Sequence, residues 1–253
     1  MVNFVGAGPG AIDLITVRGM KLIAEADVII YAGSLVNPEI LSYKKDNAVV
    51  YNSAYMTLEE VIEIINIAEK KRQNTVRLHT GDPAFYGAIR EQMDILEELG
   101  IEYKICPGVS SMSGAAASLK AEYTLPGVSQ TVIVSRMEGK TAVPDSMSIE
   151  KLAGHKATMV IFLSTGLLKE LTVSLLKGGC SPKTKAAIVY KATWHDEKII
   201  YCTIDTLEQS AKENSITKTA LILVGEFLGN VYDRSELYNP SFSTEFRDAN
   251  IQK

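Results

Sequence analysis

Apolar runs rich in β-branched residues alternate with helix-like segments through the first half of the chain. Residues 58–71 repeat apolar side chains at the helical period, with glutamates on the opposite face. Residues 88–100 behave similarly and end at Gly100, a residue suited to a helix C-terminus. The alternation predicts βαβ units, with a mostly parallel sheet and helices on both of its faces. The expected strands are residues 3–8, 27–33, 48–53, 75–81 and 103–108.

The second half of the chain carries a different pattern. Short connections, such as residues 194–197 between two apolar runs, favour antiparallel neighbours. Helical periodicity occurs only after Ser164 and over residues 204–214, so this half is expected to form a mixed sheet with helices. The expected strands are residues 130–137, 157–164, 185–193, 197–203 and 219–228.

A boundary between two domains is expected over residues 120–130, which contain the turn-forming pair Pro126 and Gly127. A length of 253 residues is compatible with one large domain or two of moderate size. The sequence therefore predicts an α/β protein with an N-terminal domain over residues 1–120 and a C-terminal domain over residues 126–253.

Charge and composition narrow the class of partner. The formal net charge of −4 gives no global attraction to nucleic acid. The longest apolar run, residues 220–225, is too short to cross a bilayer, and the first residues contain no basic leader or long apolar core. Three cysteines without C-x-x-C spacing indicate a reducing compartment. We therefore expect a cytoplasmic protein with a small-molecule ligand and neither a nucleic-acid nor a membrane partner.

Four turns that contain glycine each follow the carboxyl end of an expected strand. In an open parallel sheet these ends lie at one edge, and ligands bind in the crevice there. Glycine lets the backbone approach a ligand without an intervening Cβ. Together the turns indicate a binding cleft. They are residues 6–11, 31–34, 79–82 and 106–111.

The first turn, GAGPGA, fits the spacing of the dinucleotide fingerprint through Gly6, Gly8 and Ala11. That fingerprint also requires an acidic residue at the end of the second strand, where this chain has Tyr31, Ala32 and Gly33. A nicotinamide cofactor is therefore disfavoured but stays open as an alternative.

The segment HTGDPAFYGA, residues 79–88, has the form of a strand that turns and opens a helix. Asp82 followed by Pro83 is a common helix start, which places Phe85 and Tyr86 on the first helical turn. These aromatic rings either flank a ligand or pack against the sheet. The small residues of 108–119 open a further helix and allow close approach by a ligand or by another segment.

Four motifs together resemble the tetrapyrrole (uroporphyrin-III/precorrin) methyltransferase family of cobalamin and sirohaem biosynthesis. They are VGAGPGAIDLIT, YAGSLV, GDPAFYGA and CPGVSS, and the likeness extends over nearly the whole chain. The resemblance implies an S-adenosylmethionine-dependent methyltransferase of two α/β domains. The first would form the edge of the cofactor and tetrapyrrole cleft, and the second would complete the cofactor site. It further implies a cobalt-precorrin tetrapyrrole as acceptor, S-adenosylhomocysteine as product and a homodimer.

The same resemblance assigns site residues. Those expected to bind the cofactor are Pro9, Thr80, Gly81, Asp82, Phe85, Tyr86, Ser110, Ser111, Phe162, Leu163, Ala192 and Ala220. Tyr31, Ser34 and Leu35 are expected to contact the substrate ring, with capping of the next helix as the alternative for Ser34.

Methyl transfer from a sulfonium needs alignment of the reacting atoms more than acid–base chemistry, and no catalytic residue is assigned. The three histidines lack metal-ligand spacing, so no protein metal site is expected, and His79 alone lies beside the expected cleft. Basic side chains should bind the substrate carboxylates. The candidates are Arg18, Lys21, Arg90, Lys120, Arg136 and Lys191.

Other readings of this sequence stay open. Within the family, the acceptor could be a metal-free precorrin or another tetrapyrrole, or the ribose of RNA or a modified histidine in a protein, although RNA is disfavoured by the missing basic stripe. From other classes, a nicotinamide-dependent oxidoreductase and a non-catalytic nucleotide-binding module are the alternatives.

Overall fold

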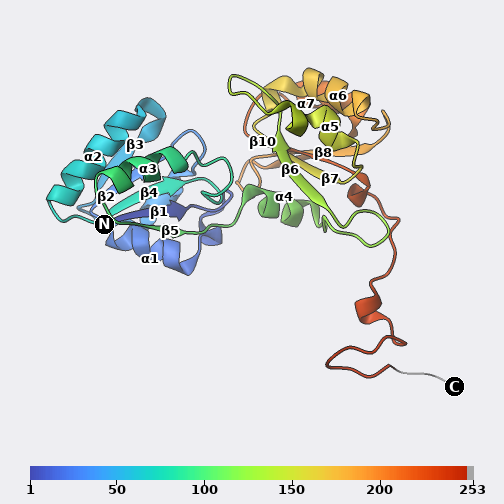
Figure 1. Cartoon of the computed structure of the whole chain (residues 1–253), viewed down its shortest axis with the longest axis horizontal. Helices are drawn as coiled ribbons and strands as arrows, with labels where there is room; N and C mark the ends of the chain where they lie inside the picture. The colour runs from blue at the N-terminus through green and yellow to red at the C-terminus, as the bar shows by residue number, and fades with distance from the viewer. Residues whose placement is uncertain (250–253) are drawn as a thin grey trace. The chain divides into compact units, whose positions relative to one another are not determined.

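A computed structural model of the chain describes residues 1–249 and divides them into two compact units (Figure 1). Unit 1 comprises Met1–Ser118 together with Lys191–Lys198, and unit 2 comprises the remaining described residues. The chain passes from the first unit to the second after Ser118. The expected domain limits of 1–120 and 126–253 place Lys191–Lys198 in the second domain, whereas in the structure this segment belongs to unit 1. We call this segment the strap.

Unit 1 contains a sheet of five parallel strands in the order β3-β2-β4-β1-β5. The predicted parallel sheet is therefore confirmed. All five carboxyl ends lie at the same edge, which we call the rim of unit 1. The strands are β1 Val2–Gly6, β2 Val28–Tyr31, β3 Val49–Asn52, β4 Thr75–His79 and β5 Tyr103–Cys106.

Helices cover both faces of this sheet, as predicted, because successive strand residues point to opposite sides. Val5 and Ile29 pack in one buried cluster with Ile23 of α1, whereas Phe4 and Ile30 pack in another with residues of α2 and α3. Figure 1 shows α1 on one side of the sheet and α2 and α3 on the other. The helices of this unit are α1 Val17–Glu25, α2 Leu58–Lys70, α3 Arg90–Glu98 and, except for its last residue, α4 Ser111–Leu119.

Helix α2 shows how local sequence specifies its own boundary. Thr57 accepts a hydrogen bond from Glu60 N at 3.3 Å, and the Glu60 carboxylate accepts one from Thr57 N at 2.7 Å. This capping box satisfies backbone donors that the first helical turn leaves open. The buried stripe Val61, Ile62, Ile65 and Ala68 then packs on the sheet, which confirms the predicted helix.

Unit 2 contains a mixed sheet in the order β6-β7-β10-β8-β9, as predicted. β6 and β7 are parallel, and β10 is antiparallel to both β7 and β8. The strands are β6 Val132–Arg136, β7 Thr158–Phe162, β8 Lys185–Tyr190, β9 Lys198–Thr203 and β10 Ala220–Val224.

Three helices bury one face of this second sheet in a common cluster that includes Leu171, Leu175, Ile161 and Ile222. They are α5 Ile149–Ala153, α6 Leu168–Lys177 and α7 Leu207–Glu213. The sequence pattern did not predict α5, because five residues are too few to show a helical period. Short 3-10 helices occupy Ile12–Leu14, Pro38–Tyr43, Ser53–Tyr55, Asp145–Met147, Thr165–Leu167, Ile204–Thr206, Glu226–Leu228 and Glu236–Tyr238.

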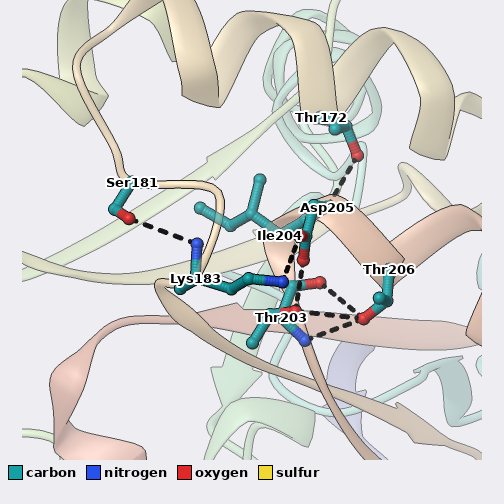
Figure 2. A network of polar contacts seen from close by, with 7 residues as sticks. All are labelled: Thr172, Ser181, Lys183, Thr203, Ile204, Asp205 and Thr206. Atoms are coloured by element: carbon teal, nitrogen blue, oxygen red, sulfur yellow. Dashed lines mark hydrogen bonds and ion pairs between the residues drawn. The ribbon is translucent and has the colours of Figure 1, made fainter.

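A polar network fixes the start of α7 in unit 2 (Figure 2). Thr203 N donates to Thr206 Oγ1 at 3.1 Å, and Lys183 Nζ lies 2.7 Å from Asp205 Oδ2. Thr172 Oγ1 on α6 donates to Ile204 O at 3.3 Å. The network joins the end of β9 to the loop before β8 and to α6.

All three cysteines are free, and Cys106 is buried at the end of β5. In the described part of the chain, no helix combines the length and the apolar character needed to cross a bilayer.

Two leucines on α6 provide a matched test of the unit 2 core. Leu171 is fully buried and Leu176 is 36% exposed. We expect Leu171→Ala to lower the free energy of unfolding by about 3 kcal/mol, because it leaves a cavity. Leu176→Ala should lower it by less than about 1 kcal/mol. Urea unfolding followed by far-ultraviolet circular dichroism measures both, and equal losses would contradict the packing.

Candidate functional site

Three of the predicted glycine turns meet at the rim of unit 1. Ala7 N donates to His79 O at 2.7 Å, which extends the pairing of β1 and β4 beyond the strands. Gly81 N then donates to Gly8 O at 2.8 Å, and Gly8 N to Gly81 O at 3.3 Å. The turns after β1 and β4 are therefore bonded to each other by their main chains.

The turn after β5 touches both of the others. A Cβ built on Gly108 would lie 2.1 Å from Gly81 O and 2.8 Å from Gly6 Cα. Contacts this short cannot be accommodated by backbone atoms. Gly6 and Gly108 are thus needed for contact between turns, and not for the ligand approach that the sequence predicts.

Asp82 joins two of these turns through its side chain. Oδ1 accepts a hydrogen bond from Ala84 N at 2.8 Å, and Oδ2 accepts one from Gly108 N at 3.0 Å. The prediction that Asp82 and Pro83 start a helix is wrong, because α3 begins only at Arg90. One Asp82 carboxylate oxygen accepts from Gly108 N in the turn after β5 and not from an N–H group of a helix. Residues 83–86 form turns in place of the predicted helical start.

Phe85 and Tyr86 consequently lie on an irregular turn and not on a helix, which corrects their predicted placement. Their residues are 42% and 43% exposed. Tyr86 and Ala88 have φ of 56° and 49°, a left-handed conformation that interrupts any helical path. Of the two alternatives for these rings, packing against the sheet is disfavoured by their exposure.

Ser110 and Ser111 form the start of α4, as the sequence predicted for this helix. Ser110 O accepts from Ser113 N at 3.0 Å and from Gly114 N at 3.1 Å. A Cβ built on Gly81 would lie 3.3 Å from Ser111 N. Any side chain at position 81 would therefore cover the first turn of this helix, where the backbone N–H groups carry partial positive charge.

The small residues of α4 allow close contact with two other segments of unit 1, the GAGPGA turn and the strap. A Cβ on Gly114 would lie 2.9 Å from Pro9 Cβ and 3.2 Å from Thr193 Cγ2. Pro9 thus packs against α4. Pro9 O accepts a hydrogen bond from Trp194 Nε1 at 3.1 Å, and Ala192 is buried in the same strap.

The GAGPGA turn does not open an α-helix. A short 3-10 helix follows it at Ile12–Leu14, and α1 begins only at Val17. Ala11 N donates to Thr193 Oγ1 at 3.0 Å and is therefore engaged by the protein. A dinucleotide site needs this turn to place a helix N-terminus at the pyrophosphate, so the arrangement argues against nicotinamide binding.

The turn after β2 carries the three residues expected at the substrate. Ser53 Oγ donates to Tyr31 O at 3.2 Å, and Gly33 N donates to Asn52 Oδ1 at 3.2 Å. Ser34 is exposed and does not cap the next element, since that role belongs to Asn37, whose side chain accepts from Glu39 N. Tyr31 and Leu35 are half-buried in the same turn.

Unit 2 brings Phe162, Leu163 and Ala220 to one edge of its own sheet. The pairing of Ile161 with Ile222 places the end of β7 beside the start of β10. Leu163 has a φ of 52° and is 60% exposed. Such strain in a non-glycine residue is typical of functional turns.

His79 and Arg77 are buried in β4 below the rim, and of the two only the histidine is a candidate from the sequence. Arg77 donates to Gln92 Oε1 and to Ile30 O, both at 3.1 Å. Burial lowers the pKa of Arg77 to about 10. Burial, followed by the nearby Arg77 charge, lowers the pKa of His79 to about 3. His79 is therefore neutral near pH 7, and its Nε2 is buried without a hydrogen-bond partner.

Half of the basic candidates are engaged locally. Arg90 pairs with Asp94 at 2.5 Å, and Lys191 pairs with Asp196 at 2.6 Å. Arg136 donates to the carbonyls of Met137, Thr141 and Ala142, so it holds its own loop. The other three have exposed side chains: Arg18, Lys21 and Lys120.

The remaining histidines show no sign of metal binding. His195 Nε2 lies 3.8 Å from Glu39 Oε2, and the His195 side chain is almost fully exposed. Within residues 1–249 there is no group of three or more His, Cys, Asp or Glu side chains that could hold a metal ion.

Comparison with known proteins gives concordant matches. The family model described as tetrapyrrole (corrin/porphyrin) methylases matches residues 1–208. Cobalt-precorrin-4 C(11)-methyltransferase of Methanocaldococcus jannaschii is 51% identical, over 97% of this chain and 95% of the relative. Precorrin-4 C(11)-methyltransferase of Pseudomonas aeruginosa is 42% identical, over 90% of each chain. The X-ray structure of a cobalt precorrin-4 methyltransferase, a cobalamin biosynthetic enzyme, matches with a TM-score of 0.88 and 44% identity, over 90% of this chain and 96% of that one.

The neutral state of His79 predicts how stability depends on pH. The pKa of His79 in the folded protein is about 3, below the ordinary value of 6.5. Between pH 6.5 and pH 3, His79 is therefore protonated in the unfolded chain but not in the folded one. The free energy of unfolding therefore falls as the pH drops below 6.5. Between pH 6.5 and 5, the wild type should lose about 1.5 kcal/mol more than His79→Phe, which cannot titrate. Urea unfolding followed by Trp194 fluorescence measures the difference, and equal losses would contradict the buried neutral state.

Proposed function

Because this chain belongs to the tetrapyrrole (corrin/porphyrin) methylases, we propose that it transfers a methyl group from S-adenosylmethionine to C11 of cobalt-precorrin-4 in cobalamin biosynthesis. The observation that carries the choice of acceptor is the 51% identity, over nearly the whole of both chains, to a relative of that name. Use of S-adenosylmethionine is general to the family.

The rim of unit 1 fits such a cofactor. The space beside Gly81 lies over the first turn of α4, where a side chain would otherwise stand 3.3 Å from Ser111 N. Partial positive charge at a helix start suits the carboxylate of an amino-acid moiety. The exposed rings of Phe85 and Tyr86 follow the same turn. We propose that Pro9, Thr80, Gly81, Asp82, Phe85, Tyr86, Ser110, Ser111 and Ala192 hold the cofactor in unit 1, and Phe162, Leu163 and Ala220 in unit 2.

When bound, the cofactor supplies an activated methyl group on a positively charged sulfur. The turns of the rim that contain Pro9, Gly81 and Asp82 would hold this donor, and its methyl group would pass to a ring carbon of the acceptor with S-adenosylhomocysteine as the leaving group. The chain's own contribution is alignment and exclusion of water, which is worth up to about 7–11 kcal/mol in well-oriented systems. The rim suits this role because its turns are bonded to one another: the main chains of Gly8 and Gly81 bond each other, and Gly108 N donates to the Asp82 carboxylate.

For the substrate, we propose contact of the ring with the turn that contains Tyr31, Ser34 and Leu35. The exposed cations Arg18, Lys21 and Lys120 are the candidates for its acetate and propionate groups. We further propose a homodimer located in the cytoplasm. A second acceptor, metal-free precorrin-4, is supported by the relative of 42% identity whose name carries no cobalt.

The activity is tested by incubating the protein with cobalt-precorrin-4 and S-adenosylmethionine labelled with ¹³C at the methyl group. We expect the product to gain one methyl group by mass and to show the label at C11 by NMR. Metal-free precorrin-4 is run in parallel. Faster turnover of that substrate would reverse the choice of acceptor, and label at another ring carbon would contradict the regiochemistry.

The cofactor site is tested with a matched pair of glycine variants. Gly81 and Gly100 both have positive φ, at 60° and 67°, but a Cβ on Gly100 would have no atom within 4 Å. Leucine imposes the same backbone strain at either position, and only at Gly81 does it cover the start of α4. Gly81→Leu should weaken the binding of S-adenosylhomocysteine at least about tenfold, equivalent to about 1.4 kcal/mol. Gly100→Leu should leave it within about twofold, as measured by isothermal titration calorimetry. Equal affinities would refute the placement.

A further inference from the structure

The strap, Lys191–Lys198, joins two strands of unit 2 but belongs to unit 1. The chain leaves β8 after Tyr190 and enters β9 at Lys198. Two of its non-glycine residues, Lys191 and Thr193, have φ of 47° and 69°. A left-handed conformation at such residues persists only where the surroundings stabilise it. The contacts of the strap should therefore be extensive and specific.

The strap holds the second half of the GAGPGA turn. Trp194 Nε1 donates to Pro9 O at 3.1 Å, and Thr193 Oγ1 accepts from Ala11 N at 3.0 Å. Between them, a Cβ built on Gly10 would lie only 2.0 Å from Trp194 Cδ1, so the indole edge lies against bare main chain. The first half of this turn is held differently, by the paired hydrogen bonds between Gly8 and Gly81.

The same segment is bonded to α4. Glu197 Oε2 accepts a hydrogen bond from Ser118 Oγ at 2.6 Å and another from Thr193 N. Glu197 thus fixes the Thr193 main chain to the C-terminal end of the helix whose N-terminal end meets Gly81. The strap therefore braces two segments that line the rim.

A cation and an aromatic ring stiffen the strap internally. Lys191 Nζ lies 5.1 Å from the centre of the Trp194 ring and 2.6 Å from Asp196 Oδ2. A cation over the face of tryptophan is the strongest of the cation–π arrangements. These contacts orient the indole before the turn meets any ligand.

We propose that Trp194 and Thr193 are positioning residues for the cofactor turn, which hold Pro9 and its neighbours in the geometry that receives S-adenosylmethionine. The proposal rests on the proposed function. Neither side chain needs to touch the cofactor. Loss of one hydrogen bond to the turn should appear as weaker cofactor binding, because the turn would have to be ordered when the ligand binds.

Two pairs of variants test the hydrogen bonds. Trp194→Phe removes the N–H donor and keeps an aromatic ring, and Thr193→Val removes the acceptor and keeps the branched shape. Each should raise the calorimetric Kd for S-adenosylhomocysteine about threefold to tenfold. Thr193→Ser keeps the hydroxyl and should retain wild-type affinity. Tyr201→Phe is the control for Trp194→Phe, since it removes a hydroxyl donated to Leu119 O, and should not change the Kd.

Trp194 is also the only tryptophan in the chain, so its fluorescence reports on this contact directly. Titration with S-adenosylhomocysteine should change the emission along a curve with the same Kd as calorimetry. Gly10→Ala should shift the emission of the free protein to longer wavelength, because the added methyl group displaces the indole. Gly166→Ala is the control, since a Cβ there has no atom within 4 Å.

The outcomes separate two failures. The positioning role would be overturned, and the proposed function left intact, by either of two results in a protein whose wild type binds S-adenosylhomocysteine. One is a Kd that is unchanged in both Trp194→Phe and Thr193→Val, and the other is wild-type fluorescence that does not respond to the ligand. A wild-type protein that binds no S-adenosylhomocysteine would overturn the proposed function and the positioning role together. Weaker binding in Thr193→Val together with wild-type affinity in Thr193→Ser would support the positioning role. A general loss of stability would not produce this difference between the two variants.

Discussion

The direct contact between main chains at the rim of unit 1 is the constraint on which the proposed site depends. Neighbouring parallel strands deliver three turns to one edge, and the turns then touch without side chains between them. Gly108 has its missing Cβ directed at Gly81 O, and the amides of Gly8 and Gly81 bond each other's carbonyls. Because the spacing is set by backbone atoms, the rim cannot adjust as a layer of side chains could. This rigidity suits a site that aligns reacting atoms.

The elements of this fold that could be predicted from sequence are those specified by local pattern. Helix α2 is one, because its stripe of apolar residues and its Thr57–Glu60 capping box lie within one stretch of chain. The parallel and mixed sheets follow from the same kind of periodicity. The predicted helix at Asp82 is wrong because its local signal was overridden by a distant partner. The carboxylate bonds Gly108 N, 26 residues further along the chain, and such a contact leaves no periodic trace.

The candidate site was predicted in part for the same reason. The glycine turns could be found because each follows a strand, and topology then places them together. The strap could not be found, since the contact of Trp194 with the Pro9 turn joins residues 185 positions apart. Its sequence is that of an ordinary connection between two strands. Arg77 was likewise missed, because an arginine inside a strand is distinguished from a surface arginine only by the burial that the fold imposes.

Arg77 and His79 also bear on the kind of chemistry the rim supports. A guanidinium that is bonded to neutral acceptors, Gln92 Oε1 and Ile30 O, remains an uncompensated positive charge inside the sheet. Burial is the main reason that His79 stays neutral, and the nearby Arg77 charge adds to it by disfavouring a second positive charge. A histidine with a pKa of about 3 is a poor proton carrier near pH 7. His79, buried below the rim, is therefore unsuited to acid–base chemistry, which is consistent with a reaction whose electrophile arrives already activated and needs chiefly to be held in place.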